Sequence, residues 1–118
     1  MDKTKTHLKK GQLHGKKEEY AENGQLLRVE NFSKGKIRGD FKIYNEDGSI
    51  EQEGSYGKNE IEGIVYHSNG KKSAESRLKG TIRYYKDKGT INIDSADLVD
   101  FKNWDEEGNL NTEFHLLS

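Results

Sequence analysis

The chain has 118 residues, a formal net charge of −1 and no cysteine. This length fits one domain, the charge balance does not indicate a nucleic-acid or membrane partner for the chain as a whole, and the lack of thiols excludes disulfides, thiolate zinc sites and cysteine nucleophiles. Only 30% of the residues are hydrophobic and 35% are charged. A repeat protein tolerates so thin a core, because each unit buries its apolar face only against its neighbours.

The N-terminal segment is basic: residues 1–17 hold six lysines and one aspartate. It contains no apolar stretch typical of a signal peptide, and no apolar run of the chain reaches the length that spans a bilayer. The absence of cysteine favours a reducing compartment, so we expect a cytoplasmic protein. We expect residues 1–10 to form a basic lead-in and residues 11–118 to form a single repeat domain.

Beyond the lead-in, an aromatic residue is followed four positions later by a glycine, and this happens five times. A fixed period of this kind indicates a repeat architecture, with five units centred on the aromatic residues. Residues on the period are typical of packing between units, with a stacking platform for bases or sugars as the functional alternative. Tyr56 and Tyr84 lie off this register and are candidates for exposed contacts. The periodic residues are Tyr20 with Gly24, Tyr44 with Gly48, Tyr66 with Gly70, Tyr85 with Gly89, and Trp104 with Gly108.

Three of these glycines follow Asn23, Asp47 or Asn69. Asn-Gly and Asp-Gly accept positive φ at both central positions of a type I′ turn, so we predict type I′ hairpins at these places. Gly15 and Gly39 come at the start of expected strands. There, we expect the missing side chain to allow the close approach of a neighbouring backbone or ring.

Apolar residues recur at equivalent positions of the units, as with Phe41, Ile82 and Phe101, which each stand three residues before the aromatic residue. The sequence therefore predicts an all-β fold, an elongated meander of antiparallel hairpin repeats that forms a single twisted sheet of about ten short strands. Residues 95–104 fit either a strand in the repeat register or a helix capped by Ser95. The repeat alignment favours the strand.

A Gly-x-x-x-Gly segment, an aromatic-bearing strand and an Asn/Asp-Gly turn together resemble MORN repeats, and most of all the short bacterial variant of YwqK-type antitoxins. Residues 34–39, Lys-Gly-Lys-Ile-Arg-Gly, followed by residues 44–48, Tyr-Asn-Glu-Asp-Gly, carry the resemblance best. It extends over residues 11–89, with a looser fifth unit to Leu116. The family usually has a bulky residue after the second glycine, where this chain has Lys16-Lys17 and Asp40-Phe41. The resemblance implies a binding scaffold with looser packing between repeats.

The chain lacks the motifs of a nucleophile elbow and of a phosphate-binding loop. Its four histidines share no spacing that would make metal ligands converge. The acidic segments 45–48 and 105–108 lack the alternating ligand set of a calcium loop and are predicted to be hairpin turns. We therefore expect no enzyme, no catalytic residue, no metal site and no cofactor.

Residues 90–118 hold seven acidic residues and one lysine, Lys102. Because a repeat array keeps sequence order in space, this gives the array a basic end and an acidic end. The acidic end is either a solvated surface or a docking surface for a basic protein such as a toxin or nuclease. An aromatic residue beside acids is a plausible binding hot spot. The candidate partner-binding residues are Asp97, Asp100, Trp104, Asp105, Glu106 and Glu107.

The sequence favours a protein-binding module, in first place an antitoxin or immunity-type inhibitor that blocks a partner toxin or effector. A phage or mobile-element inhibitor of a host defence nuclease has the same physical basis. A membrane-surface module that binds phospholipid through basic pairs such as Lys9-Lys10 is a further alternative, as is an assembly unit that adds strands edge to edge. Direct contact with nucleic acid is not expected. The oligomeric state and the binding face stay open.

Overall fold

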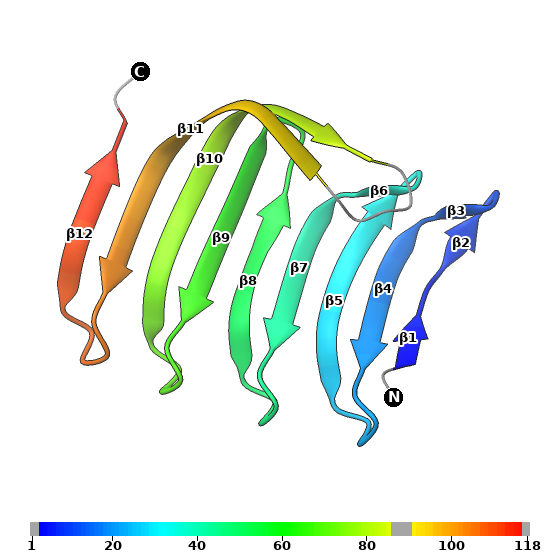
Figure 1. Ribbon diagram of the computed structural model, residues 1–118, viewed down its shortest axis with the longest axis horizontal. Helices are drawn as coiled ribbons and strands as arrows, with labels where there is room; N and C mark the ends of the chain where they lie inside the picture. Colours follow the sequence, from blue (N-terminus) through cyan, green and yellow to red (C-terminus); the bar gives the residue numbers. More distant parts are fainter. Residues whose placement is uncertain (1–2, 86–90, 117–118) are drawn as a thin grey trace.

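The computed structural model describes residues 3–85 and 91–116, and within them it contains only strands, turns and irregular segments. A ten-stranded antiparallel sheet forms a flat body with principal extents of 45 × 37 × 16 Å. Figure 1 shows the strands side by side, nearly in the order of the sequence. This confirms the predicted all-β meander. The turn predicted at Gly89 lies outside the described residues.

Neighbouring strands are joined by hairpins, so almost every strand pairs with the strands before and after it. The order across the sheet is β1-β4-β5-β7-β8-β9-β10-β11-β12; β6 also pairs with β5, and β2 and β3 form a separate two-stranded sheet. The strands are β1 (Lys3–Lys5), β2 (Leu8–Lys9), β3 (Gln12–Leu13), β4 (Gly15–Tyr20), β5 (Leu26–Ser33), β6 (Lys36–Ile37), β7 (Gly39–Tyr44), β8 (Ile50–Tyr56), β9 (Glu60–Tyr66), β10 (Lys72–Tyr84), β11 (Ile91–Trp104) and β12 (Leu110–His115).

The Asn-Gly and Asp-Gly turns form, but they are not of type I′. In the first of them, the Gly24 N–H donates to the Ala21 carbonyl at 3.0 Å, and only the glycine has positive φ, at 88°. This is the pattern of a type I turn followed by a glycine in the left-handed region. Asn23 was predicted to have positive φ, but it stabilises the turn through its side chain instead. Its Oδ1 accepts the Gln25 N–H at 2.9 Å. Asp47 and Asn69 accept equivalent bonds in their own turns.

Two-residue loops with positive φ at both positions occur instead in the Gly-x-x-x-Gly segments. Lys10 and Gly11 have φ of 52° and 76°, and Lys34 and Gly35 have φ of 51° and 83°. Both loops therefore have the backbone of a type I′ turn. Lysine tolerates this region less well than asparagine, so composition alone pointed to the wrong turns.

Positions 15 and 39 need glycine because of their backbone conformation, and not because a neighbouring group approaches them closely. Their φ values are 87° and 88°, and a Cβ at either residue would have ordinary contacts of 3.9 and 3.8 Å. The close approach that we expected there occurs at Gly54 instead. A Cβ on Gly54 would lie 2.1 Å from the Glu62 carbonyl oxygen and 2.8 Å from the Phe41 ring, which lies across from it in the ladder.

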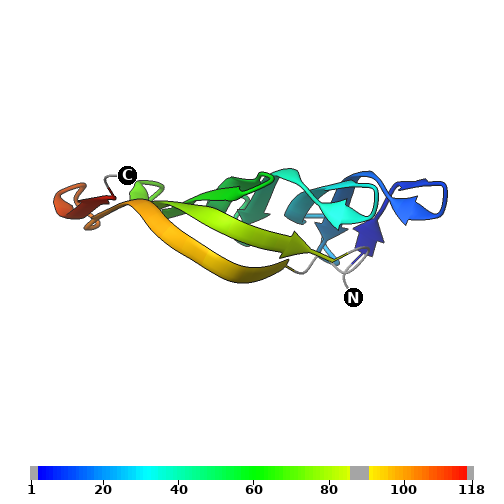
Figure 2. The ribbon, with the colours of Figure 1, turned by 90° about the horizontal axis from the view of Figure 1, so that it is seen from above.

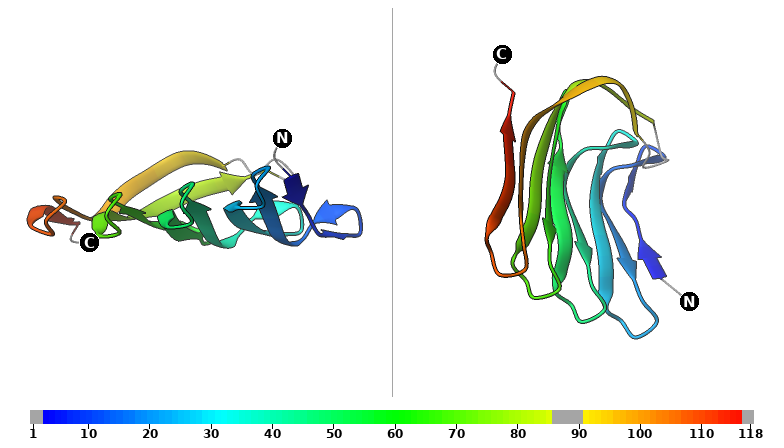
Figure 3. Two further views of the ribbon diagram at one scale, coloured as in Figure 1. Left: turned by 90° about the horizontal axis from the view of Figure 1, so that it is seen from below. Right: turned by 60° about the vertical axis from the view of Figure 1, so that its left-hand side comes forward.

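The long strands β10 and β11 bend over one face of the sheet. Their pairing register shifts between Arg77 and Leu78 and again between Thr81 and Ile82, and such irregularities bend and twist a ribbon. Figures 2 and 3 show the distal part standing off the sheet. We call this part, residues 78–84 and 91–98, the flap.

Beneath the flap lies the only compact core of the described residues, whose buried hydrophobic side chains are Phe32, Ile37 and Ile82. Tyr56 and Tyr84 belong to this region and are not the exposed contacts that the sequence suggested. The Tyr84 hydroxyl donates to the Gly57 carbonyl at 2.5 Å. The rings of Tyr84 and Tyr56 pack edge-on, with their centroids 6.4 Å apart. The flap is thus fastened to the end of β8 by a hydrogen bond and by ring packing.

Residues 95–104 are part of β11 and do not form a helix. The strand is paired with β10 along its length and with β12 over its second half. These ladders satisfy the backbone groups that a helix would have paired internally. The fourth unit of the repeat is thereby drawn into the flap, and Tyr85 stands at its end, 43% exposed, away from the other periodic aromatic residues.

Two facing glycines provide a matched test of the packing at β8 and β9. Gly54→Ala should destabilise the fold by about 1–3 kcal/mol, because the new methyl group meets backbone and the Phe41 ring. Gly63→Ala, directly opposite, should be neutral or stabilising by up to about 1 kcal/mol, because its Cβ meets only Ser76 Oγ at 3.8 Å. Urea unfolding midpoints of the two variants measure the difference. Equal effects would show that the space at Gly54 is not needed.

Candidate functional site

The sheet places two rows of charged side chains on the face opposite the flap. Residues paired across antiparallel strands point to the same face, and alternate residues of a strand share it. We call this side the charged face. Its first row is Asp40, Ser55, Glu62, Arg77, Asp100 and His115, and its second row is Lys42, Glu53, Ile64, Glu75, Lys102 and Glu113.

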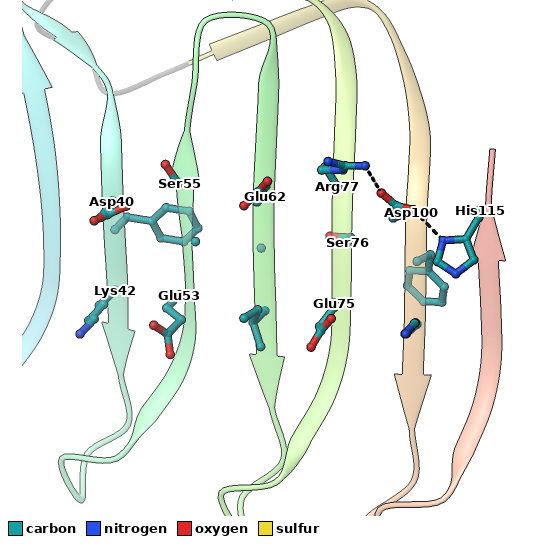
Figure 4. Close-up of a pocket in the computed structure, with 16 residues that line it drawn as sticks. Asp40, Lys42, Glu53, Ser55, Glu62, Glu75, Ser76, Arg77, Asp100 and His115 are labelled. Atoms are coloured by element: carbon teal, nitrogen blue, oxygen red, sulfur yellow. Dashed lines mark hydrogen bonds and ion pairs between the residues drawn. The ribbon is translucent and has the colours of Figure 1, made fainter. Parts of the chain in front are cut away.

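A shallow groove of about 650 Å³ runs across these rows from β7 to β12. Apart from Ser76, which lies between the rows, the labelled side chains of the groove in Figure 4 stand in the two rows on neighbouring strands. Its walls carry five carboxylates, from Asp40, Glu53, Glu62, Glu75 and Asp100, and three permanent cations, from Lys42, Arg77 and Lys102. The groove therefore has an acidic balance although the whole chain is nearly neutral.

The groove has an acidic centre, which we define as Asp40, Glu53, Glu62 and Glu75. Glu53 accepts a hydrogen bond from the Tyr66 hydroxyl at 2.7 Å, and Glu75 pairs with Lys72 at 2.5 Å. Within the described residues, the carboxylates of Asp40 and Glu62 form no ion pair. These two carboxylates are thus available to a cationic group from outside.

The C-terminal side of the groove is held by a chain of ion pairs. Arg77 contacts Asp100 and also lies 3.3 Å from Glu60, and Asp100 is bonded to His115 Nδ1 at 2.7 Å. His115 Nε2 lies 2.8 Å from Glu113 Oε1. Lys102 Nζ, at 3.5 Å from Glu113 Oε1, is the last member of this series of ion pairs. The network links β9, β10, β11 and β12, so it holds the last strand of the sheet in place.

This network shifts the pKa values of its members. The hydrogen bonds that the protonated His115 ring donates to Asp100 and then to Glu113 raise the pKa of His115 above the ordinary value of 6.5. The hydrogen bond from His115 in turn lowers the pKa of Asp100, and it also lowers that of Glu113. The charged forms therefore stabilise one another, and solvent screening keeps the effect small because the side chains of His115 and Glu113 are exposed and that of Asp100 is only partly buried.

The periodic aromatic residues Tyr20, Tyr44, Tyr66 and Trp104 lie at the ends of β4, β7, β9 and β11, on the same face as the charged rows. All four side chains are half-buried. The Tyr20 hydroxyl donates to Glu18, and the Tyr66 hydroxyl donates to Glu53. These hydrogen bonds raise the pKa of both tyrosines. The aromatic ladder therefore supports the charged row beside it.

The residues predicted from sequence to bind a partner fall into three places. Trp104, Asp105, Glu106 and Glu107 gather at the turn between β11 and β12. Asp100 belongs to the ion-pair network of the groove, and Asp97 stands further along β11, opposite Lys79. The structure thus divides this set among the turn, the charged face and the flap, which contains Asp97.

At the turn, Asp105 stabilises the hairpin through hydrogen bonds to the backbone. Its carboxylate accepts the backbone N–H groups of Asn109 at 2.8 Å and Glu107 at 3.0 Å, and these bonds lower its pKa. The neighbouring hairpin is fastened here too, because Asn69 Nδ2 donates to the Glu106 carbonyl and His67 Nε2 lies 2.8 Å from the Trp104 carbonyl. Only the carboxylates of Glu106 and Glu107 extend freely from an exposed position. Both acidic segments, 45–48 and 105–108, form hairpin turns as predicted.

Sequence reasoning missed the acidic centre and the role of Arg77 and His115. The individual residues gave no signal, since their positions in the chain are far apart. The period-two alternation of β7 to β10, combined with the hairpin positions, is the pattern that would have placed them in rows.

Among the described residues, no group of three or more His, Asp or Glu side chains is arranged to hold a metal ion. No helix that could cross a membrane was found in this part of the chain.

The comparisons with known proteins support the repeat. The family model described as MORN repeat variant matches residues 13–34 and 37–58. These segments coincide with β3 to β5 and with β6 to β8, so each match covers one complete unit. No curated protein and no solved structure matches the chain significantly. The similarity supports a repeat-based binding module and does not extend to the antitoxin variant.

The His115 network predicts a window of pH for the attachment of β12. The stability that His115 adds to the folded protein is fully present below its ordinary pKa of 6.5. It is lost as the pH rises through the raised pKa of His115. The contributions of Asp100 and Glu113 are present above their ordinary values of 3.8 and 4.5 and are lost as the pH falls through their lowered pKa values. The network should therefore be complete between about pH 4.5 and 6.5.

The test is the urea unfolding midpoint at about pH 5.5 and about pH 8.5, together with an NMR titration of the His115 ring. Wild-type protein should lose more stability between these values than His115→Gln, while His7→Gln, on an exposed residue outside the network, should behave as wild type. An unshifted His115 titration would contradict the predicted network.

Proposed function

We propose that the chain is a non-enzymatic inhibitor that binds a basic protein partner in the groove of its charged face, as an antitoxin or immunity protein does with its toxin or effector. The observation that carries this proposal is the acidic centre of the groove, whose carboxylates are fixed in two rows by the strand register. A rigid sheet holds them without further ordering, and a preformed surface binds with a smaller loss of entropy than a flexible one.

The groove suits a partner that presents lysine or arginine side chains on a loop or an extended segment. Asp40 and Glu62 lie on β7 and β9, separated by Ser55 on β8. Neighbouring strands are about 4.8 Å apart, so the two carboxylates stand on strands about 10 Å apart. Acidic clefts attract cationic partners, mainly by raising the rate of association. The exposed cation of Lys42 beside them restricts which arrangement of charges fits.

Charge reversal distinguishes the groove from the acidic turn as the binding surface. Recovery of proteins from source-cell lysate on the immobilised chain, first at low and then at high salt, provides the partner. Asp40→Lys with Glu62→Lys should then lower the association rate at low salt by about tenfold or more. Glu106→Lys with Glu107→Lys should change it little. Glu46→Lys with Glu51→Lys, at exposed residues that do not line the groove, is the matched control for the same change of net charge.

Two results would contradict this proposal. In one, the turn variant loses binding and the groove variant keeps it, which would assign the site to Glu106 and Glu107. In the other, no protein is recovered and the chain sediments with anionic vesicles at low salt, which would favour the phospholipid alternative. A partner whose activity is unchanged at stoichiometric binding would show that the chain is not its inhibitor.

A further inference from the structure

The outer edge of β12 is an open strand that carries apolar side chains. β12 is the last strand of the sheet, and all six of its residues are exposed. Phe114 and Leu116 are 43% and 45% exposed. Large apolar side chains that stay exposed on an open edge favour pairing with another strand, since natural sheets usually avoid such edges.

The backbone groups that point outward from this edge follow from the pairing on its inner side. The Leu116 N–H donates to the Val99 carbonyl at 2.8 Å, so Leu116 faces β11. Residues alternate in an antiparallel ladder between those that bond to one neighbour and those that bond to the other. Glu113 and His115 therefore direct both their N–H and C=O groups away from β11, where no strand of the described chain receives them.

The regular part of the edge is short and has a defined centre. The register with β11 shifts between Asn103 and Trp104, so that Thr112 is opposite Asn103 while Leu110 is opposite Trp104. Asn111 is the extra residue and interrupts the strand. Regular pairing on the outer side is thus restricted to residues 112–116, whose middle residue is Phe114.

We propose that β12 pairs with β12 of a second copy of this chain, antiparallel, around a two-fold axis at Phe114. In this register Glu113 of one copy faces His115 of the other, and the two residues exchange the backbone hydrogen bonds that are open in the single chain. Phe114 faces Phe114 on the flap side, and Thr112 faces Leu116. Opposite charges and an aromatic pair across strands are both favourable.

Other pairings of this edge fit less well. A two-fold axis at Glu113 would place Glu113 opposite itself, and like charges directly opposite destabilise a sheet. Pairing with the other edge of the sheet would use β1, which has only three residues. Figure 1 shows β1 and β12 pointing in the same direction. A copy added head to tail would therefore form a short parallel pair, which is weaker than an antiparallel one.

The pairing has a consequence for the charged face. A two-fold axis perpendicular to the sheet leaves both charged faces on the same side of the dimer. The ion-pair network of each copy reaches the edge of the sheet at Glu113 and His115. The networks of the two copies therefore lie next to each other in the dimer. The two grooves would lie side by side, and a partner with two basic segments would bind both at once with a gain in avidity.

Single cysteines test this register, because the chain contains none of its own. Residues at the axis form a non-hydrogen-bonded pair with Cβ atoms about 4.5–5.5 Å apart, close enough for a disulfide after a small adjustment. Phe114→Cys should therefore form a covalent dimer under mild oxidation. Thr112→Cys, on the same face and strand, should not, because the two copies of residue 112 lie about 13 Å apart along the strands. A mixture of Thr112→Cys and Leu116→Cys chains should form the mixed dimer.

A second variant tests the pairing without cysteine. Glu113→Pro removes an N–H that points outward and leaves the backbone hydrogen bonds to β11 intact, so it should abolish the concentration-dependent dimer expected for the wild type in sedimentation equilibrium. Glu113→Gln loses the ion pairs with Lys102 and His115 but keeps this N–H, so it is the control and should still form the dimer. Three results would overturn the proposal: a wild type that stays monomeric at about millimolar concentration, cross-linking of Thr112→Cys as fast as that of Phe114→Cys, or a dimer that persists in Glu113→Pro.

Discussion

The backbone ladder between antiparallel strands is the interaction on which this structure depends, because few side chains are buried. Phe32, Ile37 and Ile82 are the buried hydrophobic residues of the described chain. Each ladder hydrogen bond contributes only about 0.5–1.5 kcal/mol, but the bonds are numerous and depend on correct register. A one-residue slip would move every side chain of a strand to the other face. Register therefore decides both the stability of the sheet and the composition of its two faces.

Turns set this register, and the chain uses two kinds with different chemistry. At one end of the sheet, an asparagine or aspartate side chain caps a turn whose glycine has positive φ, as with Asn23 and Gly24. At the other end, Lys10-Gly11 and Lys34-Gly35 close two-residue loops in the first two units. In the described part of the later units, no further loop of this second kind occurs. There the chain continues into the long strands β10 and β11, whose flap supplies the core that the thin repeats do not provide.

Because register assigns each side chain to one face, the flap face and the charged face have different roles. The flap face holds the apolar contacts, including Phe41, whose ring needs the open space at Gly54. The charged face holds opposite charges in neighbouring strands, where they support the sheet at the C-terminal side and leave Asp40 and Glu62 free of ion pairs among the described residues. A binding role for this face follows from the same arrangement that stabilises it. The proposed pairing of β12 would extend the face without changing it.

The sequence by itself determined the repeat and the all-β meander, because glycines and aromatic residues at a fixed period act locally, within one hairpin. It also placed Glu106 and Glu107 correctly at an exposed turn. Local patterns did not decide the turn type, since both kinds of turn need a glycine with positive φ and differ in whether the residue before that glycine also has positive φ. Only the tertiary structure decided that Tyr84 fastens the flap to the end of β8, and that Arg77, Asp100 and His115 form one network. Those contacts join residues from different strands, and their geometry depends on register shifts, at Leu78 and Ile82, that the sequence pattern does not reveal.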